Sequence, residues 1–237
     1  MAKHILIFDI WGDYAHFKKI YATTSAVSYV IPPKTALYGY VGAILGLSKA
    51  ENQYLTYFAE KQCLIGIGLQ KPILMKRLGV NLRPNTGSVA KNLKPTMTEY
   101  VYRPRYRIYF THENEELQQK LRAQLQSHQS VFTPTLGLAS LLSNFEWIGE
   151  TTASAMTTAD AIPIHSVIPR QKFIGFDNQS LLDQENELME QSMFAVEMNS
   201  EREVTERDDI LLDRKCHPVW AFVTEYYKIQ DANIILF

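Results

Sequence analysis

The hydrophobic and polar pattern marks four expected strands in the first two thirds of the chain. Short runs rich in β-branched and aromatic residues, bounded by turn-forming residues, are typical of strands. The third run alternates large apolar side chains with arginines, which is the two-residue period of a strand that has one face toward the core. The four runs lie at residues 4–11, 62–69, 100–110 and 145–152.

Two helices are expected between these strands. The first covers residues 36–48 with Thr35 as its cap, and residues 51–60 continue it helically. The second covers residues 113–126, where leucines recur at every fourth position and therefore share one face: Leu117, Leu121 and Leu125.

The order of these elements predicts the fold. Strand, helix, strand, insertion, strand, helix and strand follow one another, which is the order of the ferredoxin-like β-α-β-β-α-β unit of RNA-recognition domains. We therefore expect an α+β protein, with a ferredoxin-like RNA-binding domain at residues 1–152 and an insertion at about 71–99. Residues 153–237 carry β-like runs and are expected to form a smaller β-rich C-terminal lobe.

Charge is separated along the chain although the formal net charge is only −1. Residues 71–107 hold nine Lys and Arg and a single acidic residue, Glu99, whereas residues 177–213 hold twelve Asp and Glu against two arginines. Such separation favours one face suited to an anionic partner, and two solvated surface segments are the alternative.

The insertion is predicted to be a basic hairpin that projects from the sheet. Turn signals stand at residues 83–87 and 92–95, and the segment is too long for an ordinary hairpin loop. Its cations would contact a nucleic-acid strand, unless the segment is simply a surface loop. They are Lys76, Arg77, Arg83, Lys91 and Lys94.

The third expected strand separates aromatic from cationic side chains. Alternation places Tyr102, Tyr106, Ile108 and Phe110 on one side and Arg103, Arg105 and Arg107 on the other. Arginines in one row repel each other, and a polyanion would relieve that repulsion, as would pairing with acidic neighbours. Pro104 cannot donate to the strand ladder, so a bulge or an edge position is expected there.

The first helix carries three glycines, Gly39, Gly42 and Gly46. Each costs roughly 1 kcal/mol of helix stability against alanine, so close approach is the expected use. Tight packing of the helix on the sheet and approach of a ligand are both open. The helix begins near Lys34 and Thr35, where free N–H groups could donate hydrogen bonds to a phosphate.

The sequence offers no recognisable catalytic, metal or cofactor site. The six histidines are scattered without metal-ligand spacing, and neither a P-loop nor a nucleophile-elbow motif is present. His16 and His112 are the best candidates for a general base, but each fits a polar surface position better. No secretory signal or membrane span is expected, and two unpaired cysteines suit the reducing cytoplasm.

Residues 28–46 resemble a known family. Ser28-Tyr29-Val30-Ile31-Pro32-Pro33-Lys34-Thr35, preceded by the aromatic Phe17 and followed by the glycine-rich helix, is similar to the CRISPR-associated protein five family (Cas five). A second similar feature is the segment Leu136-Gly137-Leu138-Ala139-Ser140. The resemblance covers residues 3–50 best, extends to about 150 and weakens beyond.

This resemblance implies a function. It implies a ferredoxin-like body with a protruding thumb, placed in the type I effector complex Cascade, most like type I-B, where it grips the 5′ handle of crRNA. The neighbours would be the backbone subunit (Cas seven) and the large subunit (Cas eight), and target DNA beside the PAM is a further candidate partner. The expected RNA-binding residues are Phe17, Lys18, Lys34, Thr35, Lys76, Arg77, Arg83, Lys91, Arg103, Arg105 and Arg107, with the glycine-rich helix beside them.

Three functions compete at this point. The first is a non-catalytic subunit that fixes the end of the guide RNA. The second is a metal-independent endoribonuclease that processes precursor crRNA, which needs only a side chain such as His, Tyr or Lys near a 2′-OH. The Tyr-Lys-His group that one branch of the family uses for this is not recognisable here. The third is a stand-alone RNA-binding protein, which would be expected to show paired aromatics on the open sheet face.

Overall fold

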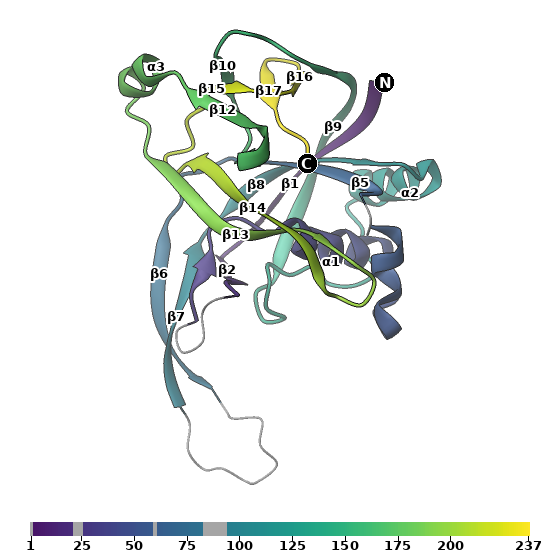
Figure 1. The fold of residues 1–237 in the computed structure, drawn as a ribbon. Coiled ribbons are helices and arrows are strands. Elements are labelled where there is room, and N and C mark those ends of the chain that lie inside the picture. The colour runs from purple at the N-terminus through teal and green to yellow at the C-terminus, as the bar shows by residue number, and fades with distance from the viewer. Residues whose placement is uncertain (1, 21–25, 59–60, 83–93) are drawn as a thin grey trace.

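The computed structural model describes residues 2–20, 26–58, 61–82 and 94–237. The chain forms a mixed α+β fold with one large curled sheet and few helices (Figure 1). The sheet has nine strands in the order β12-β15-β10-β17-β16-β9-β1-β8-β5. Four of its strands are β1 (Ala2–Gly12), β5 (Cys63–Leu69), β8 (Arg105–His112) and β9 (Ser143–Met156).

Antiparallel pairing joins these four strands in the order β9-β1-β8-β5. Alternate side chains of β1 and β8 enter the main hydrophobic core, among them Phe8, Ile10, Tyr106 and Ile108, all at most 1% exposed. Leucines and tyrosines of helices α1 (Lys34–Leu45) and α2 (Glu115–Gln126) complete that core. The intervening side chains of β1 and β8 therefore point to the opposite face of the sheet.

The helices differ from expectation at their ends. Thr35 does not cap α1: the cap is Pro33, which makes no side-chain hydrogen bond, and the helix begins at Lys34. Gly46 ends α1 with a φ of 74°. The next turn, η1 (Ala50–Tyr57), is a 3₁₀ helix interrupted by left-handed residues. In α2, the side chain of Asn114 accepts a hydrogen bond from the Leu117 N–H, and the three predicted leucines are buried.

The strand predicted at 100–110 is in fact two strands. β6 (Met75–Leu82) and β7 (Lys94–Tyr102) pair as an antiparallel hairpin that projects away from the body in Figure 1. β7 ends where Arg103 adopts a φ of 49°, and β8 starts after Pro104, which cannot donate to a ladder. β2 (Tyr14–Ala15) pairs with β7, and β3 (Phe17–Lys18) pairs with β4 (Ser28–Tyr29).

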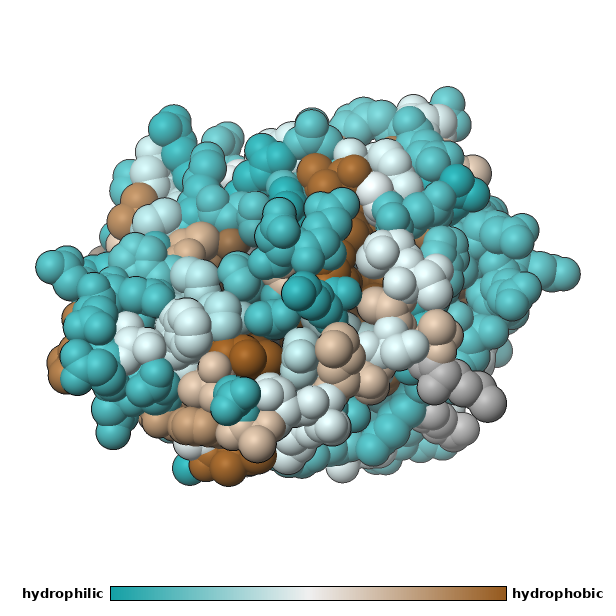
Figure 2. All heavy atoms as spheres, turned by 90° about the horizontal axis from the view of Figure 1, so that it is seen from above, coloured by the Kyte–Doolittle hydropathy of each residue, from teal (hydrophilic) through white to brown (hydrophobic). Residues whose placement is uncertain are grey.

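The last third of the chain extends the same sheet. β9 runs through residue 152 to Met156 and pairs with β16. The remaining strands of the large sheet are β10 (Ile162–Ile164), β12 (Phe173–Phe176), β15 (Val219–Val223), β16 (Tyr226–Ile229) and β17 (Ala232–Ile234). Two short helices, η2 (Arg170–Lys172) and α3 (Asn178–Asp183), flank β12 along the chain. Figure 2 looks down on the top of the molecule as drawn in Figure 1, where α3 lies, and shows this face as mostly hydrophilic with small apolar patches.

A second sheet covers the first helix. β13 (Leu188–Met198) and β14 (Val204–Asp213) form a hairpin, and β11 (Ile168–Pro169) joins β14. β13 contacts α1, and Phe194, Val196, Ile210 and Leu212 belong to the main core. The acidic stretch 177–213 is thus largely a packed hairpin, and residues on both sides of position 152 share one core.

The edge strand β5 pairs with the segment that follows β17. Ile65 in β5 exchanges two backbone hydrogen bonds with Phe237, at 3.0 and 3.2 Å. A Cβ on Gly66 would lie only 2.8 Å from the Ile235 carbonyl oxygen, so the small residues of β5 permit this approach. Among the described residues, no helix is both long and apolar enough to cross a membrane.

Candidate nucleic-acid interface

The sheet face opposite the helices carries a cluster of charge. Asp9 in β1 lies across from Arg107 in β8, and Trp11 lies across from Arg105. The buried Asp9 carboxylate accepts hydrogen bonds from Nε of Arg105 at 2.9 Å and from Nε of Arg107 at 2.8 Å. These hydrogen bonds to Asp9 are the main reason that the pKa of Arg107 is raised above its ordinary value. Asp9 therefore fixes both guanidinium groups on the sheet.

Arg105 has two further contacts. Its Nη2 donates to Glu146 in β9 at 2.6 Å, and its guanidinium carbon lies 4.8 Å from the Trp11 ring. Arg105 and Arg107 thus have the acidic partners that the alternative interpretation of the arginine row proposed. Their side chains are still 30% and 28% exposed, so they remain open to solvent on one side.

An open hollow of about 580 Å³ adjoins this cluster. Trp11 and Arg105 line it on one side, and Lys71, Arg103 and Leu142 are among its other lining residues. Lys71 and Arg103 are exposed and form no ion pair with any residue that the structure describes. The hollow therefore combines three cations and an aromatic ring with one exposed carboxylate, that of Asp13. Its excess of positive charge and its aromatic ring suit a phosphate backbone and its bases.

The β6–β7 hairpin continues this surface. The Lys76 Nζ lies 3.5 Å from the centre of the Tyr102 ring, and the Arg103 guanidinium carbon lies 5.2 Å from the same ring. Tyr14 lies beside Tyr102, with ring centres 5.4 Å apart. We call the surface formed by Trp11, Lys71, Lys76, Tyr102, Arg103 and Arg105 the cationic strip.

Other predicted residues have different surroundings. Arg77 is exposed but donates twice to Glu99, at 2.7 and 3.0 Å. Lys18 is exposed on β3, away from the contacts that define the cationic strip, and Thr35 is half-buried in the first turn of α1. Arg83 and Lys91 lie outside the described residues.

Phe17 and Lys34 are buried, which corrects their expected role at the surface. Phe17 is 4% exposed and packs beside Tyr106. Lys34 is 1% exposed, and its Nζ lies 3.6 Å from Glu197 in β13. Tyr38 also donates to Glu197 at 2.8 Å, and burial raises the pKa of this tyrosine. In this structure both side chains stabilise the fold and neither is accessible to RNA.

The glycines of α1 have three different environments. Gly39 is exposed with open space around it, Gly42 meets Tyr54 at ordinary contact distance, and Gly46 is the left-handed helix end beside Val131. Packing of the helix on the sheet, one of the two expected uses, explains none of them. Only Gly39 leaves a surface that another chain could approach.

The Leu136-Gly137 segment has a structural role. Leu136 accepts a backbone hydrogen bond from His16 at 3.1 Å, and Gly137 has a φ of 97°. A Cβ on Gly137 would overlap the His16 carbonyl oxygen. The segment therefore seats the loop before β9 against the strand that follows β1.

The two histidines considered as bases are engaged in the fold. His16 is buried, and its Nδ1 lies 2.8 Å from the Glu99 carbonyl oxygen. His112 contacts the Tyr57 carbonyl through Nε2 and accepts from the Asn114 N–H through Nδ1. Burial lowers the pKa of His112.

Sequence reasoning missed four residues of this surface: Asp9, Trp11, Lys71 and Glu146. A signal existed for the first two, because Asp9 and Trp11 alternate with Phe8 and Ile10 in the first strand. Glu146 alternates with Phe145 and Trp147 in the same way. Lys71 gave no pattern beyond its charge.

The sequence matches the family described as CRISPR-associated protein (Cas_Cas5) over residues 5–219. The chain belongs to this family. Among curated proteins there is no match.

Solved structures are similar to this Cas5 family member at low identity, and the first of them shares its fold. A CRISPR protein from Archaeoglobus fulgidus is 12% identical, with a TM-score of 0.54 over 99% of this chain and 98% of that chain. A chain of a CRISPR RNA-guided surveillance complex is 11% identical, with a TM-score of 0.49 over 92% of this chain and 91% of the other. A chain of a type III-B Cmr-beta complex bound to cognate target RNA is 11% identical, with a TM-score of 0.43 over 92% and 86%.

Proposed function

We propose that this Cas5 family member is a non-catalytic subunit of a type I CRISPR effector complex, Cascade, that binds and caps the 5′ handle of crRNA. The cationic strip carries this proposal, because exposed cations interleaved with aromatic rings suit the phosphates and unstacked bases of a single strand. The family places the chain among CRISPR-associated proteins.

The geometry of the strip favours a positioning role. Arg105 is fixed by Asp9 and Glu146 and stacks on Trp11, so its guanidinium is pre-oriented before RNA binds. Lys71 and Arg103 add charge without acidic partners in the described part of the chain. A phosphate bound there would interact with both of these cations. Because Arg105 is already oriented, less side-chain entropy is lost on binding.

The finer fold assignment is part of the proposal. The antiparallel order β9-β1-β8-β5, with α1 and α2 contributing to the core on one face, supports a ferredoxin-like unit. The β6–β7 hairpin leaves this unit between β5 and β8 and supports the thumb assignment (Figure 1).

The partners follow from the same proposal. In Cascade the chain would contact the backbone subunit and the large subunit in the cytoplasm, with target DNA beside the PAM as a further candidate, and it would need no cofactor. The open surface around Gly39 suits close approach of another protein chain. Type I-B remains the proposed subtype.

Binding measurements test this function. The full chain should bind a labelled RNA that carries the 5′ handle and lose affinity when the handle is removed. Lys71→Ala and Arg103→Ala should each weaken binding and reduce the salt slope by about 0.7, the value for one phosphate contact on a single strand. Lys120→Ala, an exposed lysine on α2, is the matched control and should change neither. Equal binding of RNA with and without the handle would contradict the proposal.

A further inference from the structure

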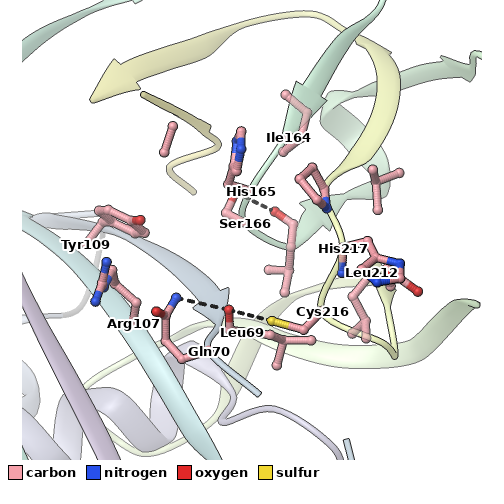
Figure 3. A pocket seen from close by; sticks show the side chains of 15 residues that line it. Leu69, Gln70, Arg107, Tyr109, Ile164, His165, Ser166, Leu212, Cys216 and His217 are labelled. Atoms are coloured by element: carbon pink, nitrogen blue, oxygen red, sulfur yellow. Dashed lines mark hydrogen bonds and ion pairs between the residues drawn. The ribbon is translucent and has the colours of Figure 1, made fainter. Parts of the chain in front are cut away.

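A second cavity lies between the central sheet and the last third of the chain. Its volume is about 290 Å³, close to the lower end of small-molecule sites at roughly 300 Å³. Figure 3 shows Arg107, Tyr109 and Gln70 on one side and His165, Ser166 and His217 on the other. The cavity is separate from the hollow of the cationic strip, whose lining residues it does not share.

The walls of this cavity combine apolar side chains with polar ones, among them the buried carboxylate of Asp213. Tyr109 is 5% exposed, Ile164 1% and Leu212 2%, so these side chains are already packed and present firm surfaces. At one side Cys216 donates through Sγ to the Leu69 carbonyl at 3.0 Å, and burial raises the pKa of this thiol. Tyr109, Ile164 and Leu212 therefore offer apolar surface against which the face of a flat ring could pack.

Polar groups without full pairing line the same cavity. His165 accepts from the Asn233 N–H through Nδ1 at 3.2 Å, which places the proton of the neutral ring on Nε2, a donor with no recorded partner among the described residues. The Gln70 side chain donates to the Leu69 carbonyl at 3.0 Å, and its oxygen is left to accept. Arg107 binds Asp9 through Nε and Nη2, and its guanidinium keeps further N–H groups.

The cavity is joined to the cationic strip through two contacts. Asp9 binds both Arg105 of the strip and Arg107 of the cavity. The Gln70 N–H donates to the Arg105 carbonyl at 3.0 Å. Arg105 of the strip and Arg107 of the cavity are therefore neighbours on one face of β8, held by the same carboxylate.

We propose that this cavity holds one unstacked base of the RNA that the cationic strip binds. The proposal rests on the proposed function and adds a specific subsite to it. Apolar walls would cover the ring faces, and the His165, Gln70 and Arg107 groups would contact the donors and acceptors of the base edge. A protein side chain in the same cavity is the competing occupant, and it predicts no dependence on any single base.

A base-by-base scan of the RNA tests this proposal with the full chain. Each RNA carries the 5′ handle with 2-aminopurine at one position, and its fluorescence rises where the base leaves the stack. One position should show a rise on binding, and an abasic residue at that position should lower affinity about tenfold, the scale of one protein–base contact. Abasic residues elsewhere should have smaller effects.

Two variants assign the effect to this cavity. Gln70→Ala removes a base-edge contact, and Ala232→Trp fills the space from β17. In both, the special position should lose its fluorescence rise, and the abasic penalty should fall to that of other positions. Gln119→Ala, an exposed glutamine on α2, is the control and should behave as the unchanged protein.

The outcomes separate the two proposals. Tight binding of the handle with no special position would overturn the cavity proposal and leave the proposed function standing. A special position that survives in both folded variants would place the base elsewhere and also overturn it. Failure of the unchanged protein to bind the handle would overturn the proposed function and this inference together.

Discussion

Asp9 and Arg107 form a two-point ion pair across neighbouring strands, with Nε 2.8 Å from Oδ1 and Nη2 3.2 Å from Oδ2. The Asp9 side chain is 2% exposed, whereas the Arg107 side chain is 28% exposed. The buried Asp9 carboxylate therefore fixes the partly exposed guanidinium of Arg107, and it also fixes that of Arg105.

Replacing Asp9 by asparagine should destabilise the fold. Asn keeps the shape but removes the charge that Arg105 and Arg107 face, so the free energy of unfolding should fall by about 1.5–3 kcal/mol. Urea denaturation measures this change. Asp13→Asn is the control, because Asp13 is exposed and its side chain has no recorded bond in the described part of the chain. Equal effects of the two substitutions would show that the buried ion pair contributes nothing.

Local patterns could predict the elements of the central sheet. The four apolar runs became β1, β5, β8 and β9, because alternation reflects one buried sheet face. The break at Arg103 was only hinted at by Pro104, since a left-handed φ at an arginine depends on the surrounding fold.

Long-range partners could not be predicted. Lys34 looked like a surface cation at a helix start, and its burial depends on Glu197, which lies far along the chain inside a stretch that looked solvated. Arg105 and Arg107 were correctly placed on the face opposite the core, but their pairing with Asp9 depends on strand register. Charge alone therefore predicted which segment is rich in cations, and packing decides which of those cations are exposed.

The Lys34–Glu197 pair should behave as a structural contact. Lys34→Met leaves a buried carboxylate without its cation and should cost about 3–5 kcal/mol of unfolding free energy. Adding Glu197→Gln should recover part of that loss in a double-mutant cycle. Unchanged stability with weaker RNA binding per folded molecule would instead support the role first expected for Lys34.

Alanine substitutions at the exposed glycines Gly137 and Gly39 should change the free energy of unfolding in opposite directions. Gly137→Ala should lower the free energy of unfolding by at least about 1–3 kcal/mol, because its φ is positive and its Cβ would meet His16. Gly39→Ala should raise it by up to about 1 kcal/mol, since the site is helical and open. Thermal denaturation distinguishes them, and a stable Gly137→Ala protein would refute the seating role of the Leu136-Gly137 segment.

The protein should not cut RNA. Purified chain incubated with labelled repeat RNA in EDTA should protect the 5′ handle and yield no discrete product. A general base normally contributes about 10²–10⁴-fold in rate, and both nitrogens of His112 face backbone groups. A single cut that His16→Ala or His112→Ala abolishes, with binding intact, would establish the ribonuclease alternative.

Crosslinking within the assembled complex tests the central claim most directly. The complex would be purified from cells that express the whole operon with a CRISPR array, irradiated with ultraviolet light, and its peptide–RNA adducts identified by mass spectrometry. The account predicts that this chain co-purifies stoichiometrically with crRNA and that peptides containing Trp11 or Tyr102 crosslink to the 5′ handle. Recovery of a free chain without RNA, or crosslinks confined to the spacer or the 3′ end, would contradict it.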